Sequence, residues 1–322
     1  MSRSGWRAVV RWGRFVAAAA VLAVLVWRVG ADAFLTGLRR IDAPSVIVAV
    51  VLNAIATVAC AQRWRVVAAA LGAGIDRGAA VAAYYRAQFL NTALPGGVLG
   101  DVHRGVRHGR ESDDVGRGLR AVAWERGIGQ AVQVVVVLVL LVALPSPLRG
   151  ALPYVGAGAG LLVLVLATAA LRRRWAATVR DDARALLSHR VGRVAGPASL
   201  VVVAAHVATF VVAARTAGAP AGVAHLLPLA GLVLLAMGLP LNVGGWGPRE
   251  GVAAWAFAAA GMTAAQGVAA ATVYGVLVVI ASLPGAAVLL LTPRRRRPAP
   301  APGRVRATPP VRPGLVTGAR RG

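Results

Sequence analysis

The 322-residue chain is 58% hydrophobic and 15% charged, and this composition is typical of a membrane protein with several spans rather than of a soluble domain. Its formal net charge is +25, and its lysine and arginine positions are all arginine. The single cysteine, Cys60, excludes an intrachain disulfide and a cysteine-based metal site. The five histidines have no metal-ligand spacing, and no nucleotide-binding glycine motif occurs. We therefore expect neither a metal nor a cofactor.

Apolar stretches follow one another along most of the chain. A helix needs roughly 20 apolar residues to cross a hydrocarbon core of about 30 Å. Two stretches, 79–110 and 226–262, are interrupted by proline and glycine, and we interpret them as helical hairpins that enter and leave the membrane on one side. The stretches predicted to be simple spans are 15–30, 44–61, 121–144, 153–171, 198–217 and 265–292.

The distribution of arginines indicates the orientation, because cytoplasmic segments of membrane proteins carry an excess of positive charge. With a cytoplasmic N-terminus and re-entrant hairpins, most arginines lie in cytoplasmic segments, which include a loop at 172–197 and a tail at 293–322. The external loops then hold Arg39, Arg40 and Arg149. We therefore expect a plasma-membrane protein with several spans and with both termini in the cytoplasm.

The order of the predicted elements repeats in opposite orientation. Residues 1–144 are expected to form three transmembrane helices and a hairpin from the cytoplasm, and residues 151–292 the same set with a hairpin from outside. Many transporters are built from such an inverted repeat. We predict an all-α polytopic membrane protein with a transmembrane domain at 1–292 and a disordered, Pro- and Arg-rich cytoplasmic tail at 293–322.

The two interrupted stretches contain related motifs, LPGGVLGDVHR at 94–104 and LPLNVGGWGPR at 239–249. Leucine and valine matches are common in so apolar a chain, so the shared proline, glycine and arginine positions carry the similarity. An offset of 145 positions aligns Pro95 with Pro240, Gly100 with Gly245 and Arg104 with Arg249.

A helix that breaks inside the membrane exposes backbone N–H groups and a partial positive charge, and both attract anions. Such breaks persist only where protein buries them or where they line a wet cavity. Glycine lets a ligand approach the backbone, and the planar fork of arginine fits a phosphate. We therefore predict a polar intramembrane cavity with Arg249 on one wall and Arg104, Gly96, Gly97 and Gly100 on the other.

Each charged pair near these motifs also has a purely structural explanation. Arg249 and Glu250 would form an ion pair at a membrane edge. Asp101 and Arg104 would be interfacial side chains beside a cytoplasmic loop, and Glu125 and Arg126 would be charges at a helix start. The sequence alone leaves both explanations open. Trp64 and Trp124 are predicted to lie in the interfacial aromatic belts.

The segments FLNTALPGGVLGDVHR, AVAWERGIGQ and MGLPLNVGGWGPREG occur in this order along the chain. With an RWR at 63–65, they resemble the transmembrane domain of lysylphosphatidylglycerol synthases and their flippase-like relatives. The resemblance covers nearly the whole chain to about residue 292. The sequence departs from the family pattern at Leu99, where a second glycine often precedes Gly100. The matching positions are Asn91, Pro95, Gly100, Asp101, Arg104, Glu125, Arg126, Gly129, Pro240, Gly244, Gly245, Gly247, Arg249 and Glu250.

The resemblance implies an integral membrane protein that moves a phospholipid or a lipid-linked precursor. We expect Arg104, Arg126 and Arg249 to hold a phosphate, with neighbouring carboxylates that balance the charge or contact a cationic headgroup. Breaks between half-helices are expected at Pro95 and Pro240. The predicted headgroup-binding residues are Asn91, Gly96, Gly97, Gly100, Asp101, Arg104, Glu125, Arg126, Asn242, Gly244, Gly245, Gly247, Arg249 and Glu250.

Two other functions remain open at this stage. One is an enzyme that acts on a lipid-linked substrate, although the sequence contains no recognisable nucleophile–base pair. The other is a non-catalytic membrane partner of a lipid-modifying enzyme or glycosyltransferase in cell-envelope assembly. Family members that make aminoacyl-lipids carry a separate soluble domain, which residues 293–322 are too few to form, so we expect no synthase activity. Membrane lipids are the expected partners, and nucleic acid is not.

Overall fold

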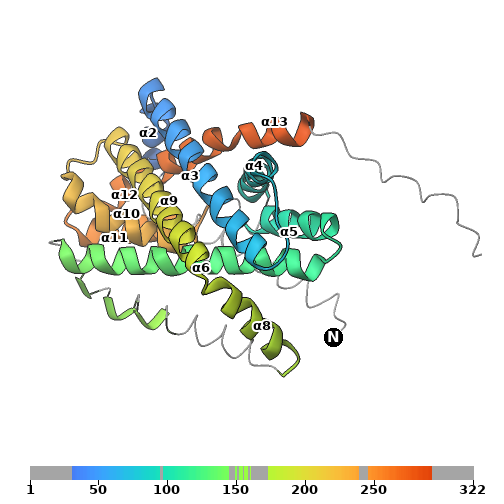
Figure 1. The fold of residues 1–322 in the computed structure, drawn as a ribbon. Helices are drawn as coiled ribbons and strands as arrows, with labels where there is room; N and C mark the ends of the chain where they lie inside the picture. The colour runs from blue at the N-terminus through green and yellow to red at the C-terminus, as the bar shows by residue number, and fades with distance from the viewer. Residues whose placement is uncertain are drawn as a thin grey trace, which may run out of the picture.

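The computed structural model describes residues 31–94, 97–144, 173–238 and 246–291, together with parts of 149–160. Within these residues the chain forms helices joined by short turns, and no strand occurs (Figure 1). The predicted all-α class is therefore confirmed.

Four long apolar helices have the length and composition of membrane spans. Each contains 28 or 29 residues and is about 42 Å long, which exceeds the thickness of a hydrocarbon core. They confirm four of the six predicted spans, whereas the predicted spans at 15–30 and 153–171 lie wholly or mostly outside the described residues. The four are α3 (Ala43–Ala70), α6 (Val115–Ala143), α9 (His189–Thr216) and the run of α12 (Ala264–Ser282) with α13 (Pro284–Leu291).

The two interrupted stretches each form a pair of shorter helices. The first pair is α4 (Arg77–Ala93) and α5 (Leu99–Glu111), and the second is α10 (Val223–Met237) and α11 (Pro248–Ala259). The two helices of each pair pack against each other. One helix therefore ends before each proline- and glycine-rich motif and another begins at its far end, as predicted, while Pro95 and Pro240 themselves lie outside the described residues.

The same series of helix lengths occurs twice. The N-terminal unit, α3 to α6, has helices of 28, 17, 13 and 29 residues. The C-terminal unit, α9 to α13, has helices of 28, 15 and 12 residues followed by the 28-residue run of α12 and α13. Two units with the same element order therefore follow each other along the chain.

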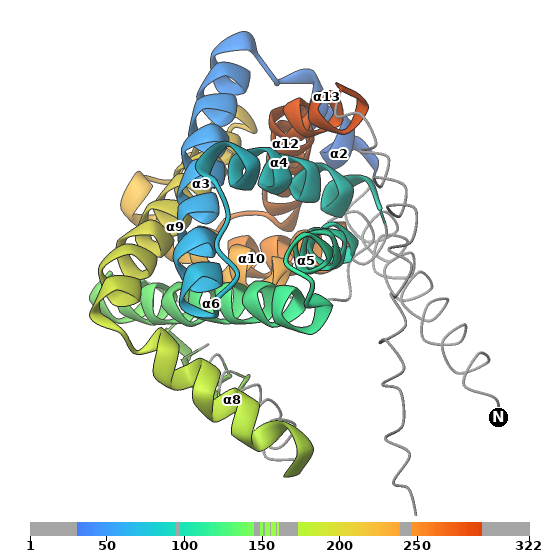
Figure 2. The ribbon, with the colours of Figure 1, turned by 45° about the vertical axis from the view of Figure 1, so that its right-hand side comes forward.

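Helices α3 and α9 lie against each other and run in opposite directions (Figures 1 and 2). Just before α3 begins, Arg40 donates a hydrogen bond of 2.6 Å to the carbonyl oxygen of Ala217, just after α9 ends. Near the other end of α3, Val67 packs in one buried cluster with Val191 and Ala195 from the start of α9. The leading helices of the two units are therefore antiparallel.

Helix α8 (Arg173–Leu186) extends away from the bundle before α9 begins (Figures 1 and 2). Asp182 anchors it to α6, because its carboxylate accepts hydrogen bonds from Arg120 Nε at 2.9 Å and from Trp124 Nε1 at 3.1 Å. The segment at 172–197, predicted to be a cytoplasmic loop, contains the strongly amphipathic helix α8 and the start of α9. Arg173, Arg174, Arg180 and Arg184 lie on α8, and Arg190 and Arg193 lie on α9. The cytoplasmic location of the segment stays a prediction.

Polar side chains at the helix starts explain where several helices begin. Asp76 accepts hydrogen bonds from the backbone N–H groups of Gly78 and Ala79 at the start of α4, and Asp114 accepts one from Arg117 at the start of α6. Such N-caps satisfy backbone donors that have no partner inside the helix. Asp42 and Ser45, and likewise Thr263 and Gln266, form reciprocal capping boxes at α3 and α12.

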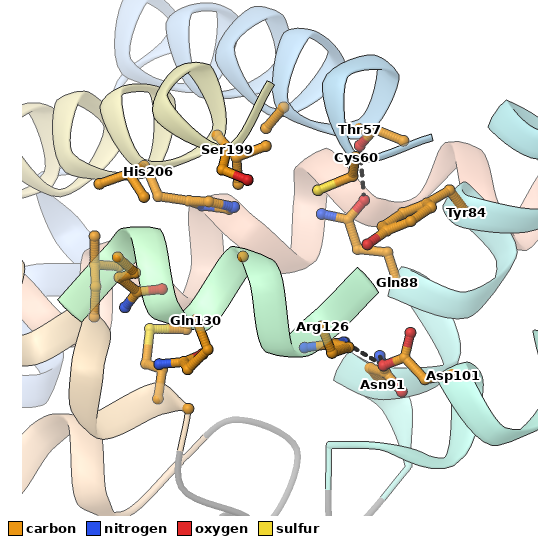
Figure 3. Close-up of a pocket in the computed structure, with 18 of the residues that line it drawn as sticks. Thr57, Cys60, Tyr84, Gln88, Asn91, Asp101, Arg126, Gln130, Ser199 and His206 are labelled. Carbon is orange, nitrogen blue, oxygen red and sulfur yellow. Dashed lines mark hydrogen bonds and ion pairs between the residues drawn. The ribbon is translucent and has the colours of Figure 1, made fainter. Parts of the chain in front are cut away.

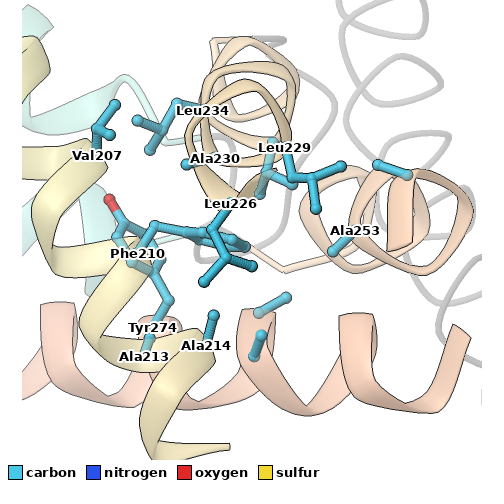
Figure 4. Close-up of a cluster of buried hydrophobic side chains, with 14 of the residues drawn as sticks. Val207, Phe210, Ala213, Ala214, Leu226, Leu229, Ala230, Leu234, Ala253 and Tyr274 are labelled. Carbon is cyan, nitrogen blue, oxygen red and sulfur yellow. The ribbon is translucent and has the colours of Figure 1, made fainter. Parts of the chain in front are cut away.

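The largest apolar cluster of the described residues lies mostly in the C-terminal unit (Figure 4). Phe210 of α9 contacts both Phe257 of α11 and Tyr274 of α12, with ring centroids 6.4 and 5.7 Å apart. Small residues let the helices approach closely: a Cβ atom on Gly267 would lie 2.2 Å from the carbonyl oxygen of Ala253. In the N-terminal unit, by contrast, the helices meet around charged groups.

Candidate functional site

A cavity of about 270 Å³ lies between the two units (Figure 3). Helices α3, α4 and α6 supply most of its polar lining, and α9, α10 and Tyr274 of α12 supply the opposite side. Its lining residues are Ala56, Thr57, Cys60, Arg63, Tyr84, Gln88, Asn91, Thr92, Gly97, Asp101, Arg126, Gly129, Gln130, Gln133, Ser199, Val202, Val203, His206, Leu234, Met237, Gly238 and Tyr274.

Many lining residues form pairs with one constant separation along the chain. Cys60 of α3 and His206 of α9 both line the cavity, and they lie 146 positions apart. The cavity therefore receives equivalent positions from equivalent helices of the two units. The pairs with this separation are Ala56 with Val202, Thr57 with Val203, Cys60 with His206, Gln88 with Leu234, Asn91 with Met237, and Thr92 with Gly238.

Glu125 is the centre of a buried network beside the cavity. Its Oε1 accepts from Arg63 Nη2 at 2.5 Å, Arg63 Nε at 2.8 Å and the Tyr84 hydroxyl at 3.0 Å. Its Oε2 accepts from Arg104 Nη2 at 3.0 Å. Arg63 also donates to the Ser199 hydroxyl at 2.9 Å and thereby joins α3 to α9. This network satisfies both oxygens of a carboxylate that is fully buried.

Arg104 is enclosed rather than presented to a ligand. Its guanidinium carbon lies 4.5 Å from the centroid of the Trp64 ring and 4.1 Å from that of the Tyr84 ring. Its remaining hydrogen bond goes to Asp101 Oδ1 at 3.0 Å, while Nε and Nη1 have no hydrogen-bond partner. Cation–π contacts with the two rings stabilise the charge in their place.

Arg126 differs from the other arginines of the network. Its guanidinium pairs with Asp101 Oδ2, yet 51% of its side chain is exposed, against 6% for Arg63 and none for Arg104. Asn91 holds Asp101 from α4 through a hydrogen bond of 2.8 Å, and its own carbonyl oxygen accepts from the backbone N–H of Gly100 at 2.7 Å. Arg126 therefore presents the most accessible positive charge to the cavity (Figure 3).

Arg249 and Glu250 form a separate buried pair at the start of α11. Arg249 Nη2 and Nε lie 2.5 and 2.8 Å from Glu250 Oε1, and the backbone N–H of Gly247 donates to Glu250 Oε2 at 2.7 Å. Gly247 has φ of 113°, a conformation that glycine adopts readily. The guanidinium occupies the space beside Gly275, where a Cβ atom would lie 2.3 Å from it. The geometry is that of a structural ion pair.

Arg249 is nevertheless in contact with a ring that lines the cavity. Its guanidinium carbon lies 4.8 Å from the centroid of the Trp246 ring and 5.8 Å from that of Tyr274. Tyr274 in turn bonds to His206 Nδ1 through its hydroxyl, at 3.1 Å. Arg104 and Arg249 thus occupy similar surroundings in the two units, because each lies between two aromatic rings near a helix break.

The structure places the predicted site residues in different surroundings. Asn91, Gly97, Asp101 and Arg126 line the cavity. Arg104 and Glu125 lie directly behind this lining, whereas Arg249, Glu250 and Gly247 form the pair at α11. Gly100 permits close packing of α5 on α4, because a Cβ atom there would lie 1.9 Å from Ala87 O. Outside the described residues lie Gly96, Asn242, Gly244 and Gly245, with the predicted breaks at Pro95 and Pro240.

One prediction about a tryptophan and several omissions are corrected by the structure. Trp64 is fully buried beneath Arg104 and so lacks the surroundings expected of a belt residue. Trp124 is partly exposed and donates to Asp182, and its place in an interfacial belt stays a prediction. Helical spacing from Arg126 could have indicated Gln130 and Gln133, which follow it by four and seven positions on the same helix. The site residues that sequence reasoning did not assign include Arg63, Tyr84, Gln88, Gln130, Gln133, Ser199, His206 and Tyr274.

These observations define a helical membrane protein with a charged, internally paired cavity between two similar units. The family model of the lysylphosphatidylglycerol synthase TM region matches residues 11–285, and the chain therefore belongs to this family. This match confirms the resemblance inferred from the three motifs. Comparisons with curated proteins and with solved structures gave no match.

Proposed function

We propose that the protein is a flippase-like lipid translocase of the plasma membrane that moves a phosphate-bearing headgroup through the cavity. The observation that carries this proposal is the exposed face of Arg126 inside a body whose outer helices are apolar. On α6, for example, Val135, Val139 and Val142 are 57–60% exposed and form one apolar stripe. An apolar exterior with a charged interior suits a protein that shields a polar headgroup from hydrocarbon.

The headgroup phosphate is proposed to bind Arg126, with the hydrogen bond from Asn91 keeping Asp101 in place beside it. Arginine can donate two hydrogen bonds to one phosphate, so a ligand would compete with Asp101 for the exposed side of the guanidinium. Arg63, Arg104 and Glu125 would hold this arrangement without contacting the lipid. These described groups are held in ion pairs rather than presented as a nucleophile and a base, which supports transport rather than catalysis.

The two units are proposed to form an inverted repeat with re-entrant hairpins. The antiparallel packing of α3 on α9 and the matched helix lengths support this arrangement. The paired positions around the cavity support a site between the units, where rocking of one unit against the other would expose it to each side in turn. The arginine distribution supports a cytoplasmic location of both termini.

Transport should be tested in liposomes that contain the purified full chain and a trace of fluorescent phospholipid in both leaflets. Accelerated exchange between leaflets, lost in Arg126→Gln, would support the proposal. Arg184→Gln is the matched control, because Arg184 forms an exposed pair with Asp181 on α8, away from the cavity. Equal exchange rates in liposomes with and without folded protein would contradict the proposed translocase.

A second candidate is a membrane partner of a lipid-modifying enzyme or glycosyltransferase. It is favoured by α8, which extends from the bundle (Figure 2). This helix carries exposed charges at Asp181 and Arg184. Such a helix offers a surface for docking. In the liposome experiment, no lipid movement would favour this candidate, and co-purification of a lipid-modifying enzyme, lost on reversal of the α8 charges, would then support it.

A further inference from the structure

His206 lies on the α9 side of the cavity, apart from the ion pairs that the described arginines form. The residue is only partly buried, and its ring lies among the side chains that line the cavity (Figure 3). It is the one histidine among the described lining residues. An unperturbed histidine changes its charge between pH 5 and 8. This ring is therefore the lining side chain best suited by its chemistry to gain a proton near neutral pH.

The hydroxyl of Tyr274 fixes one nitrogen of the His206 ring. The hydroxyl oxygen lies 3.1 Å from Nδ1, and among the described residues it has no other hydrogen-bond partner. Because Tyr274 is fully buried, its O–H needs an acceptor, and Nδ1 is the acceptor within reach. In the neutral ring, therefore, Tyr274 donates to Nδ1 and the ring hydrogen lies on Nε2.

Protonation of His206 would reverse this hydrogen bond. An imidazolium carries hydrogen on both nitrogens, so Nδ1 would donate to the oxygen of Tyr274, and the hydroxyl hydrogen would need a new acceptor. Tyr274 itself lines the cavity, so an oxygen atom of a ligand there can accept this hydrogen. The charged form of His206 therefore offers a ligand one hydrogen-bond donor that the neutral form does not offer.

The charges around His206 favour its neutral form until an anion enters the cavity. In the described network three arginines meet two carboxylates, so the network carries one net positive charge. A protonated His206 would add a second positive charge to the same cavity, which is unfavourable unless an anion enters with the proton. The titratable and charged groups that line the cavity with His206 are Cys60 and Arg63 from α3, Tyr84 from α4, Asp101 from α5, Arg126 from α6 and Tyr274 from α12, with the Arg249–Glu250 pair behind Tyr274.

We propose that His206 is a proton-binding site that is filled together with an anionic group in the cavity. The proton comes from the solvent and adds to Nδ1, Nε2 keeps its hydrogen, and the ring becomes positively charged. The inference rests on the proposed function in taking a phosphate-bearing headgroup as the anion, but binding of the pair does not require that the pair be moved. A proton and a headgroup that cross the membrane together would let a pH difference across the membrane drive the movement of the lipid.

The test measures the protons that the purified full chain takes up when it binds a short-chain, water-soluble phosphatidylglycerol in detergent. Isothermal titration calorimetry in two buffers with different ionisation enthalpies gives this number. Between pH 6 and 8 we expect the wild type to take up a proton with the probe, and its affinity to fall by up to about tenfold for each unit of rising pH. His206→Gln has a polar but neutral side chain and should bind the probe without proton uptake and with the same affinity across this range. His225→Gln, the same change at an exposed histidine of α10, should behave like the wild type.

Binding without proton uptake by the wild type would overturn the inference, whatever the variants do. Uptake that persists in folded His206→Gln would also overturn it, and would assign the proton to another group, such as an Asp101 that the probe has separated from Arg126. Tyr274→Phe is a second variant, which lacks the hydroxyl beside Nδ1 and should take up fewer protons than the wild type.

The same measurement separates this inference from the proposed function. No binding of the probe at any pH would overturn both the proton site and the headgroup site. Proton-linked binding without lipid movement in liposomes would contradict the translocase alone. Lipid movement by a wild-type protein that binds the probe without proton uptake would contradict the role of His206 alone.

Discussion

The guanidinium of Arg126 and the carboxylate of Asp101 form an ion pair on the cavity wall in which 51% of the arginine side chain and only 8% of the aspartate side chain are exposed. Arg249 and Glu250 form the contrasting pair, with 3% and none exposed. The first pair is accessible from the cavity, whereas the second is covered by the packing of α11. Ion pairs in the two units therefore differ in accessibility, although the motifs that contain them are similar.

Removing one charge of the buried Arg249–Glu250 pair should destabilise the protein more than removing both charges. Arg249→Gln leaves the fully buried Glu250 without its cation, so we expect a loss of about 3–5 kcal/mol. Arg249→Gln combined with Glu250→Gln removes both charges and should be less destabilising than the single change. Thermal unfolding in detergent compares the three proteins. A double variant less stable than the single one would show that the pair contributes more than mutual neutralisation.

Glu125 is predicted to be the most sensitive carboxylate of the described network. Glu125→Gln would leave Arg63 and Arg104 without their shared counter-charge, and we expect a loss of about 3–5 kcal/mol in unfolding free energy. Glu111→Gln is the control, because Glu111 pairs with Arg107 on the surface and should change stability by less than about 1 kcal/mol. Similar losses in the two variants, measured by denaturant or thermal unfolding in detergent, would disprove the central role of Glu125.

Two glycines in neighbouring helices predict opposite outcomes for the same substitution. Gly100→Ala would place a Cβ atom 1.9 Å from the backbone oxygen of Ala87, so α4 and α5 must separate, and we expect a loss of at least about 1–3 kcal/mol. Gly127→Ala meets no atom within 4 Å on α6 and should be neutral or slightly stabilising. Unfolding curves of the two variants decide this. Equal behaviour would mean that the α4–α5 contact contributes nothing at Gly100.

The sequence predicted the helical class, the four described spans and the two interruptions between short helices, because apolar length and proline–glycine clusters act locally. It also predicted Asp101 and Arg126 as site residues from their motifs. It could not separate Arg126 from Arg104, since the two differ only in which side chains cover them. Trp64 and Tyr84, distant in sequence, enclose Arg104 and remove it from the cavity.

Residues outside the motifs were missed for a related reason. Ser199 and His206 lie in an ordinary apolar span, and only the packing of α9 against α3 brings them to the cavity. The equivalent positions in the two units became visible once the helix boundaries were known. The two motifs align when their positions differ by 145 along the chain, whereas paired lining residues such as Cys60 and His206 lie 146 positions apart.

The exposed caps at the helix starts predict how stability depends on pH. Hydrogen bonds from the backbone N–H groups of Ala79, Arg77 and Gly78 lower the pKa of Asp76 below its usual value of 3.8. A carboxylate with a lowered pKa stabilises the folded state fully above the pKa of the unfolded chain, and this contribution disappears as the pH falls through the folded value. Protonation below about pH 3.8 should therefore weaken the start of α4.

Comparison with Asp76→Asn isolates this effect from other groups that titrate in acid. Asparagine also accepts hydrogen bonds at an N-cap but carries no charge, so it lacks the favourable interaction with the helix dipole. We expect the wild type to unfold at a higher temperature than Asp76→Asn at pH 6, and the difference to shrink as the pH falls below 3.8. Differential scanning fluorimetry in detergent measures both proteins across this range. A difference that stays constant with pH would show that the ionised form of Asp76 does not stabilise α4.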